Sequence, residues 1–321
     1  MIPLKAQGNL FIILFNGYGD AFLALPVLRQ IIQQFRRHKI YLACFDFQIN
    51  TLFHDLEVDF VAGESIEKKI LPSKELKKLR FEQLVSFNAY YPDSFESEIR
   101  KIYPDVTRWG FCDFNGTPFP KFQTSSRHMR EQYFEVIGWK PLYSQAQRQV
   151  RILPQAQRKF NDFFQDTLSS KPLFYTLHLD SLREKMWNLK NWFSIIEYLW
   201  SKWNARPLIL GEETPEAEEL TMKFSFARKL PSSMGIDAHF AAIENTEFFI
   251  GIDSIFAHIA DSFQKLMIVL FGPSDNLVWG PTNPNSIIVK PRIGNSTNNI
   301  SPEEVIILLD QVFNRRANNA N

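Results

Sequence analysis

Short, uninterrupted apolar runs alternate along this chain with stretches in which apolar residues recur at helical spacing. The first run, Asn9–Phe15 (NLFIILF), ends at a glycine-containing turn and leads into a helical pattern over Ala21–Phe35. Strands that are buried on both faces read as continuous apolar runs, and their alternation with helices is typical of parallel sheets covered by helices. The sequence therefore predicts an α/β fold built on parallel sheets.

The alternation is most regular in the second half of the chain. Further apolar runs predict strands at Ile40–Phe45, Pro172–Leu179, Pro207–Leu210, Glu247–Ile252 and Leu266–Phe271. The rest of the first half repeats short apolar runs, such as Phe81–Phe87, among helical and loop patterns. Helical spacing predicts helices over Trp192–Trp203, Glu216–Phe226, Ala238–Glu244, Phe256–Phe263 and Pro302–Phe313. Most of residues 110–130, rich in Gly, Pro, Ser and aromatic side chains, is assigned no regular structure.

A chain of 321 residues exceeds the usual span of one hydrophobic core, so two domains are expected. A polar, basic stretch places the junction near residues 140–170. We expect a Rossmann-like domain over residues 1–165, a second over 166–300, and a closing helix and tail over 301–321. In open parallel sheets ligands bind beyond the carboxyl ends of the strands, so the functional loops are expected to follow Phe15, Leu179, Leu210, Ile252 and Phe271.

Composition and charge exclude several classes of protein. The apolar fraction of 45% is that of a globular chain, and no apolar run approaches the roughly 20 residues that span a bilayer. With no secretory signal and only two distant cysteines, Cys44 and Cys112, a cytoplasmic location is expected. A net charge of +1 without a dense basic stripe argues against nucleic-acid binding.

The charge is unevenly distributed. Lys and Arg exceed Asp and Glu by 22 − 17 = 5 in residues 1–165, whereas the acids exceed the bases by 18 − 14 = 4 in residues 166–321. A basic first half favours an anionic partner or peripheral contact with the inner, anionic face of a membrane, although scattered solvated charge gives the same numbers.

The first candidate site is the turn Asn16–Asp20 (NGYGD) after the first predicted strand. Gly17 and Gly19 let backbone approach a ligand closely, and Asp20 stands where a helix begins. The third glycine of a dinucleotide fingerprint is replaced by Phe22, which counts against an ordinary dinucleotide fold. On the residues alone, Asp20 is either a functional acid or simply the cap of the helix.

A second candidate, Gly251–His258 (GIDSIFAH), leaves a predicted strand and turns into a helix. Ser254 at the helix entrance, with free backbone N–H groups behind it and the positive end of the helix dipole, suits a diphosphate. His258 falls four residues later on the same helix face, where a lone histidine is more often a packing residue.

Two further loops follow predicted strands. Arg183 and Lys185 precede Trp187 in the loop after Leu179, where cations are able to neutralise phosphate oxygens. Gly272 stands in a rigid Gly-Pro loop after Phe271. Taken singly, the two cations are equally well explained as solvated surface charges, and Gly272 as an ordinary loop glycine.

Together, these segments resemble the lipopolysaccharide heptosyltransferase family, glycosyltransferase family 9. The resemblance is carried by GYGD after a strand, by LHLDSLREKMW, by GEETPE and by GIDSIFAHIADSFQKLMIVLFGPSDNLVWGP. It is strongest over residues 172–290 and 10–30 and slight over 45–165. It implies a GT-B fold, in which two Rossmann-like domains with parallel sheets face each other across a cleft. It also implies transfer of a sugar, heptose-like, from an ADP-activated or other nucleotide diphosphate donor to an acceptor hydroxyl.

The resemblance implies roles for single residues as well. Asp20 matches the general base that acts on the acceptor hydroxyl, and Lys185 matches the basic residue expected on the donor phosphates. Met234 falls where a loop lies against the nucleotide base, and Glu216, or Glu213, falls near a ribose-contacting acid. The donor-binding positions are Gly17, Gly19, Lys185, Glu216, Met234, Asp253, Ser254, Ile255 and His258. Phosphate-contacting or structural roles fall to Arg183, Trp187 and Gly272.

Three residues depart from the family pattern. Ile255 stands where the family usually has glycine, and its Cβ restricts the backbone and the approach of a phosphate. Asn188 replaces a common proline, and Asp261 interrupts an alanine-rich helix. These departures leave the identity of the donor open.

The chain contains no Asp-x-Asp and no His-Glu-x-x-His, so no metal and no other cofactor is expected. Cations and the helix dipole are expected to act on the diphosphate instead, with direct displacement and inversion at the anomeric carbon. The acceptor is a glycan, a lipid-linked molecule or a protein. Two alternatives stay open: another nucleotide-sugar enzyme such as an epimerase, and a family member that binds nucleotide or a partner without turnover.

Overall fold

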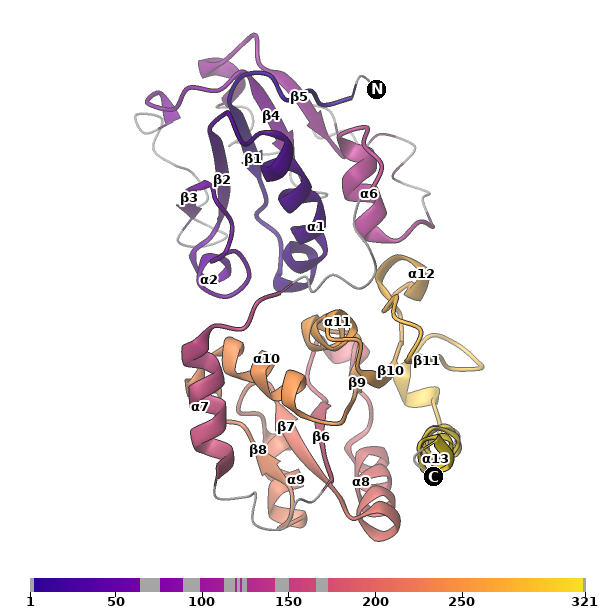
Figure 1. Cartoon of the computed structure of the whole chain (residues 1–321). Coiled ribbons are helices and arrows are strands. Elements are labelled where there is room, and N and C mark those ends of the chain that lie inside the picture. The colour runs from indigo at the N-terminus through magenta and orange to yellow at the C-terminus, as the bar shows by residue number, and fades with distance from the viewer. Residues whose placement is uncertain are drawn as a thin grey trace. The chain divides into compact units, whose positions relative to one another are not determined.

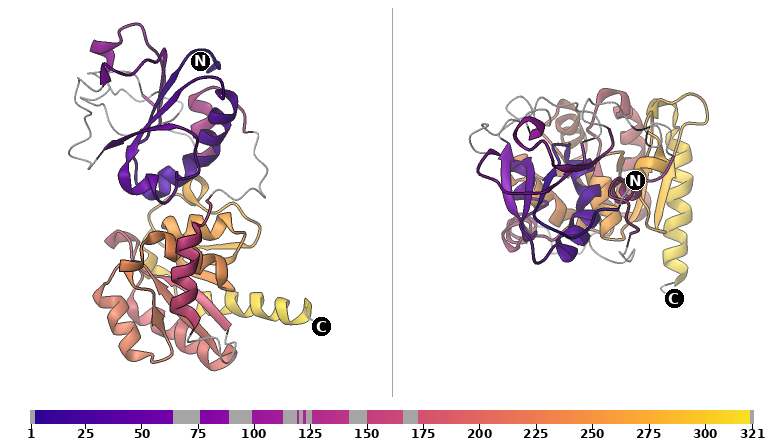
Figure 2. Two further views of the ribbon diagram at one scale, coloured as in Figure 1. Left: turned by 60° about the vertical axis from the view of Figure 1, so that its left-hand side comes forward. Right: turned by 90° about the horizontal axis from the view of Figure 1, so that it is seen from above.

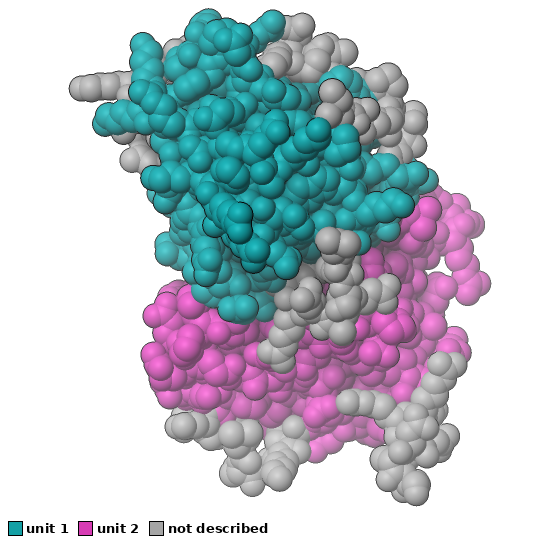
Figure 3. All heavy atoms as spheres, turned by 45° about the horizontal axis from the view of Figure 1, so that its top comes forward, with its two compact units in different colours: residues 1–151 teal, residues 152–321 magenta. Residues whose placement is uncertain are grey.

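The computed structural model of the chain describes residues 3–63, 76–88, 99–112, 119, 122, 126–141, 150–165 and 173–319. The chain forms two compact units, residues 1–151 and 152–321, which Figure 3 colours separately. The division falls before helix α7 (Pro154–Gln165), whereas the sequence pattern predicts that this helix belongs to the first domain. Helix α7 packs against α10 (Ile236–Asn245), which explains why it belongs to the second unit.

The first unit is built on a five-stranded parallel sheet in the order β3-β2-β1-β4-β5 (Figure 1). Its elements are β1 Leu10–Ile13, α1 Tyr18–Gln34, β2 Ile40–Phe45, α2 Asp46–Ile49, β3 Asp59–Gly63, β4 Gln83–Ser86, β5 Thr107–Gly110 and α6 Met129–Val136. The chain runs from β1 through β2 to β3 and then returns to β4 on the other side of β1. The strand order therefore reverses between β1 and β4, the kind of point at which open α/β sheets bind ligands.

Strand β1 is the central strand of the first sheet, and all four of its residues are buried. Aromatic side chains fill the core on one face of this sheet, where Phe11 stacks on Phe81 with ring centroids 4.9 Å apart. Helix α1 packs against α6. It begins at Tyr18 rather than at Ala21, so the predicted loop residues Gly19 and Asp20 lie inside its first turn.

The second unit is built on a six-stranded sheet in the order β11-β10-β9-β6-β7-β8 (Figure 1). Its strands and the 3-10 helices between them are β6 Leu173–His178, η2 Arg183–Lys185, β7 Ala205–Leu210, β8 Arg228–Lys229, η3 Ser232–Met234, β9 Phe248–Ile252, β10 Leu266–Leu270, β11 Ser286–Val289 and η4 Thr297–Asn299. Its further helices are α8 Leu189–Trp203, α9 Pro215–Lys223, α11 Ile255–Ser262, α12 Asn276–Trp279 and α13 Pro302–Asn319. All strand pairs are parallel, and the strand order reverses between β6 and β9.

The predicted closing helix, α13, is part of the second unit. It packs along α8, and Phe313 stacks on Trp203 with ring centroids 5.0 Å apart. In Figure 2 its C-terminal part extends beyond the rest of this unit. No helix in the described part of the chain is both long enough and apolar enough to cross a bilayer. The two parallel sheets with their helices confirm the predicted α/β class with two Rossmann-like units.

Candidate functional site

Polar side chains hold the turn after β1 at the reversal point of the first sheet. The Phe15 N–H donates to Oδ1 of Asn88, just beyond β4, at 2.8 Å. Nδ2 of the Asn16 side chain donates to the Phe87 carbonyl at 3.1 Å, and Nε2 of Gln48, on α2, donates to the Asn16 carbonyl at 2.6 Å. These bonds fix the backbone that leads into α1.

Asp20 lies at this turn with a half-buried side chain. The hydroxyl of Tyr133, on α6, donates to its Oδ1 at 3.5 Å. Gly17, not Asp20, is the N-cap residue of α1. A Cβ added to Gly17 would meet nothing within 4 Å, and its φ of −62° is open to any residue. The space beside Gly17, next to Asp20, is therefore open, and the backbone there does not need a glycine.

Two residues of this region, Asn88 and Tyr133, were not predicted from the sequence. Asn88 is 1% exposed, and among the described residues its Nδ2 has no hydrogen-bond partner; the same holds for the Ser86 hydroxyl. Buried polar groups without partners are uncommon in proteins, so the end of β4 is an unusual region of the first unit. The only signal in the sequence is an asparagine directly after the short apolar run Phe81–Phe87.

In the second unit, the carboxyl ends of β6 and β9 bring together residues that lie far apart in the sequence. Nζ of Lys185 forms a 2.6 Å ion pair with Oδ2 of Asp253. The Asp253 side chain is 6% exposed and the Lys185 side chain 23%. A Cβ at Gly251 would lie 2.9 Å from the His178 carbonyl oxygen, so this close approach of the strands requires glycine. Asp253 thus fixes the position of the Lys185 ammonium at this edge of the sheet.

The loop that carries Lys185 is fastened to the loop before α13. Oγ1 of Thr297 lies 3.0 Å from the Lys185 carbonyl oxygen and 2.8 Å from that of Met186. Trp187 is buried, and its Nε1 donates to the Ile300 carbonyl at 3.0 Å. Trp187 therefore anchors the loop, and the lysine two residues earlier is held by that anchor.

The remaining residues singled out from this part of the sequence are placed as follows. A Cβ at Gly272 would lie 3.2 Å from the Thr297 amide, so this glycine makes room for the same loop. Arg183 is exposed, and no ion pair is found for it among the described residues. His258 is 5% exposed in the body of α11.

Ser254 is the N-cap residue of α11 and follows Asp253 directly. Its hydroxyl makes no cap bond; its Oγ lies 3.0 Å from Nδ1 of His178, at the end of β6. No described residue accepts from the N–H groups of Ile255 and Phe256, as is usual in the first turn of a helix. These amides and the Lys185 ammonium form one group of donors at the reversal point of the sheet.

Ile255, the departure from the family glycine, is the first residue of α11 and is half-buried. Among the described non-glycine residues only Asn204 and Gln264 have positive φ, so the backbone at Ile255 needs no glycine. The backbone conformation therefore does not disfavour an isoleucine at position 255, and only the bulk of its side chain could hinder a phosphate.

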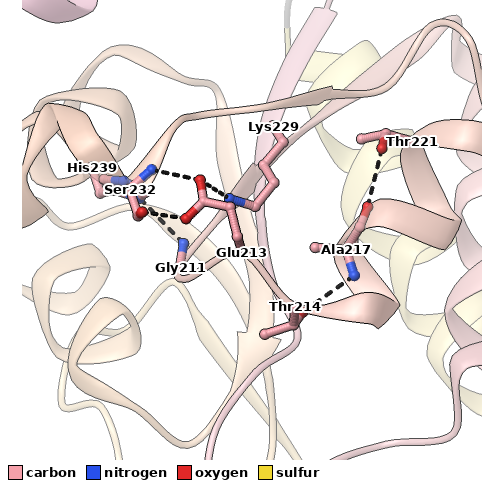
Figure 4. Close-up of polar contacts among 8 residues, drawn as sticks. All are labelled: Gly211, Glu213, Thr214, Ala217, Thr221, Lys229, Ser232 and His239. Carbon is pink, nitrogen blue, oxygen red and sulfur yellow. Dashed lines mark hydrogen bonds and ion pairs between the residues drawn. The ribbon is translucent and has the colours of Figure 1, made fainter.

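Glu213, one of the two acids considered for a ribose, lies in the turn after β7 (Figure 4). Glu213 accepts from Lys229 Nζ at 2.8 Å, from the Ser232 N–H at 2.9 Å and from the Ser232 hydroxyl, and the bond from Lys229 is the main cause that lowers its pKa to about 2. Glu216 lies half-buried in the first turn of α9, with no ion-pair partner among the described residues. Glu213 thus holds the turn at Met234, whereas Glu216 has no such structural bond among the described residues.

Met234 ends the short helix that Glu213 fastens. Its side chain is half-buried, and its carbonyl accepts from Lys159 of α7 at 2.9 Å. Gly235 follows with a φ of +88°, which favours glycine, and caps α10. The position of the Met234 loop is therefore fixed from both sides.

Two buried histidines lie beneath these loops. Burial lowers the pKa of His178 to about 3, and the neighbouring His239 contributes in the same direction. Burial also lowers the pKa of His239 to about 4, against a hydrogen bond to the Pro231 carbonyl that raises it. Nδ1 of His239 accepts from the Gly211 N–H at 3.2 Å (Figure 4). Both rings are neutral at pH 7.

These histidines should make the fold sensitive to mild acid. The unfolded chain takes up their protons near pH 6.5, whereas the folded unit resists until about pH 3 to 4, so stability is lost as the pH falls through this window. From pH 7 to pH 5 we expect a loss of about 2 kcal/mol per histidine. Urea unfolding at pH 7, 6 and 5 measures it, with His239→Asn expected to remove about half of the dependence. A free energy of unfolding that stays flat above pH 5 would contradict it.

Among the described residues, no three His, Cys, Asp or Glu side chains gather into a metal-binding group.

Comparisons with known proteins agree with this fold. A crystal structure of a family 9 glycosyl transferase from Veillonella parvula superposes with a TM-score of 0.76 at 14% identity, covering 97% of this chain and 98% of that one. The E. coli ADP-heptose lps heptosyltransferase II gives 0.75 at 15%, covering 96% and 99%. The E. coli heptosyltransferase WaaC gives 0.68 at 15%, covering 94% and 99%. The fold is that of these GT-B heptosyltransferases.

Other comparisons bear on the alternatives. A candidate UDP-N-acetylglucosamine 2-epimerase of Listeria monocytogenes is less similar, with a TM-score of 0.52 at 11% identity over 96% of this chain and 88% of that one. No curated protein matches the chain. The family model described as "Glycosyltransferase family 9 (heptosyltransferase)" matches residues 123–304, more than half of the 321 residues. The chain therefore belongs to glycosyltransferase family 9, the heptosyltransferase family.

Proposed function

We propose that this glycosyltransferase transfers a heptose-like sugar from an ADP-activated donor to an acceptor hydroxyl, with inversion and without a metal. The observation that carries the proposal is the group formed by Lys185, Asp253, Ser254 and the first amides of α11 at the reversal point of the second sheet. Such a group offers a cation, a hydroxyl and backbone N–H groups to one anionic ligand.

The donor's diphosphate suits this group because the same positive groups bind its negative charge and stabilise it as a leaving group. The lysine ammonium and the positive end of the α11 dipole neutralise the phosphates in the ground state. They stabilise the leaving nucleotide diphosphate more strongly as the bond to the sugar breaks. In support, the similar WaaC has been solved with ADP and with ADP-2-deoxy-2-fluoro heptose. Glu216 and Met234, on the neighbouring loops, are proposed for the ribose and the base, and His258 is proposed for the donor site on the family resemblance alone.

The acceptor half of the reaction is proposed for Asp20. A carboxylate at the start of α1, beside the open space at Gly17, is able to take the proton of an acceptor hydroxyl as its oxygen attacks the anomeric carbon. Attack by that oxygen on the face opposite the diphosphate inverts the configuration. The net charge of +5 in residues 1–165 favours an anionic acceptor, a glycan or a lipid-linked molecule, and contact with an anionic membrane surface.

Metal independence gives a direct test. Because Lys185 and the helix amides are proposed to act on the diphosphate, full turnover is expected in excess EDTA after exhaustive dialysis against it. Sugar transfer from ADP-heptose is measured with and without chelator, and the metal content of the protein is determined beside it. Loss of turnover in EDTA that added Mg²⁺ restores would overturn this part of the proposal.

The donor and the reaction type are separated by one series of experiments. A thermal-shift screen with ADP-, UDP-, GDP- and dTDP-sugars identifies the nucleotide, because a ligand that binds only the folded state raises its stability with ln(1 + [L]/Kd). Incubating the preferred donor with and without acceptor then separates transfer from epimerisation, which needs no second substrate. Tight ADP binding without transfer to any acceptor would favour a binding protein without turnover.

The bulk of Ile255 is testable on the same assay. We expect Ile255→Gly to change donor affinity less than about tenfold, because the backbone there is already helical and its amide already faces outward from the first turn. Donor binding that appears only in the glycine variant would show that Ile255 closes the site.

A further inference from the structure

The Ser254 hydroxyl is not used by its own helix. A serine at the N-cap usually accepts a hydrogen bond from an amide two or three residues later, which satisfies one of the free N–H groups. Here that bond is absent, and Oγ lies 3.0 Å from Nδ1 of His178. The hydroxyl is thus directed by a residue of strand β6, 76 positions earlier in the chain.

His178 is itself held rigidly. Its side chain is 4% exposed at the end of β6, and its ring lies 4.5 Å from that of Phe256, in the first turn of α11. On the other side stands Gly211, where an added Cβ would lie 3.3 Å from both Cδ2 and Nε2 of the ring. The φ of +108° at Gly211 also favours glycine, so the backbone brings its Cα against the imidazole. The ring therefore has one position, and Ser254 is set by it.

The position of the single ring proton decides what Ser254 can do. A neutral imidazole carries one N–H and one lone pair. With the proton on Nε2, Nδ1 would accept from the serine hydroxyl, and the Nε2–H would find no acceptor among the described residues and would have to donate to solvent or to a ligand. With the proton on Nδ1, the N–H is satisfied by Oγ, and only a lone pair is left over, which is the less costly of the two.

We propose that His178 is a positioning residue of the donor site: its Nδ1–H donates to Oγ of Ser254, so that the serine hydroxyl must donate outward to a phosphate oxygen. This inference rests on the proposed function, in which a diphosphate occupies the group at the start of α11. The hydroxyl then joins the amides of Ile255 and Phe256 as a third donor from the same turn. The low pKa of His178, caused mainly by burial, keeps this arrangement unchanged throughout the neutral range.

The test combines ADP binding with one direct view of the ring. Ser254→Ala should weaken ADP binding about 10- to 100-fold, because it removes a hydrogen bond to a charged group. His178→Phe, which keeps a ring but no donor, should weaken it about 3- to 10-fold by leaving the hydroxyl free to rotate. In the double variant, His178→Phe should add nothing to Ser254→Ala. His178→Asn should restore most of the affinity, since its Nδ2 stands where Nδ1 stood.

His239 supplies the matched control. It is a buried histidine that also lies against Phe256, with ring centroids 5.8 Å apart, but its Nδ1 bonds to Gly211 and not to Ser254. His239→Phe should lower the melting temperature and leave ADP affinity within about twofold. The ¹⁵N-histidine spectrum of the folded protein contains signals from six histidines, and the signal of His178 is the one that disappears in His178→Asn. That signal should show a protonated Nδ1 and an unprotonated Nε2.

The outcomes separate this inference from the function on which it rests. A wild-type protein that does not bind ADP overturns the donor assignment and the inference with it. If ADP binds and Ser254→Ala weakens binding, but His178→Phe does not, only the role of His178 is overturned. If the double variant loses ADP affinity by the product of the two single-variant losses, or if Nδ1 of His178 is unprotonated, the role of His178 alone is again overturned. Coupled losses together with a protonated Nδ1 support it.

Discussion

Replacing Asp20 by asparagine is expected to lower turnover about 10²- to 10⁴-fold while leaving ADP affinity nearly unchanged. A general base acts chiefly in the transition state, so its removal affects kcat far more than donor binding. Asparagine has the same shape, and its Oδ1 still accepts from the Tyr133 hydroxyl, so the turn should keep its structure. Steady-state sugar transfer and ADP titration on the same preparation measure the two effects.

Asp46 provides the matched control for Asp20. It also stands in the first turn of a helix that follows a strand of the first sheet, but it is exposed and its turn follows β2 rather than the reversal point. Asp46→Asn should keep full turnover. Tyr133→Phe, which removes the two weak 3.5 Å bonds of the hydroxyl to Asp20 Oδ1 and from Asn16 Nδ2, should cost less than about tenfold. Full activity in Asp20→Asn would leave Asp20 with a structural role only.

The central strands could be predicted from sequence because burial on both faces leaves an unbroken apolar run. Strands β1, β2, β9 and β10 are such runs, and each was found within a few residues of its ends. The edge strands β3, β5, β8 and β11 were missed. Residues Thr107–Gly110 of β5 grade from exposed to buried, and β8 is only two residues long, so neither shows a strand pattern.

The loops of the candidate site followed from topology, but the contacts within them did not. Parallel strands end at one edge, so the turns after Phe15, Leu179 and Ile252 were predictable as candidate ligand loops. The pairing of Lys185 with Asp253 spans 68 residues and depends on β6 lying beside β9, a strand order that no local pattern specifies. Distant partners such as Tyr133 arise in the same way, from the packing of α6 on α1.

Asp261 is a residue whose role could not be inferred from the sequence motif in which it lies. In the sequence it interrupts an alanine-rich helix and reads as a departure from the family pattern. In the structure it is 3% exposed and accepts from the N–H groups of Thr282 and Asn283 at 2.9 and 2.7 Å. The acid fixes the loop after α12, so its role is structural. A single unusual residue in a motif reports on function only after its partners are known.

Removing the Lys185 ammonium is expected to lower kcat/KM about 10²- to 10³-fold, because one charge on the departing diphosphate is lost. Lys185→Met alone also leaves Asp253, 6% exposed, without its partner, at a cost of about 1–3 kcal/mol in stability. Lys185→Met combined with Asp253→Asn removes both charges, so stability should recover while turnover does not. Urea unfolding and sugar transfer, measured on wild type and on both variants, separate folding from chemistry.

The nearby Lys190 tests whether any positive charge would serve. It is exposed at the start of α8, and none of the described residues forms an ion pair with its ammonium. Lys190→Met should therefore keep full turnover. Lys185→Arg should be intermediate, since guanidinium keeps the charge but does not fit an ammonium site at 2.6 Å from Asp253. If the double variant recovered turnover together with stability, the lysine would serve only to neutralise Asp253, and the diphosphate would have to be held by the helix amides alone.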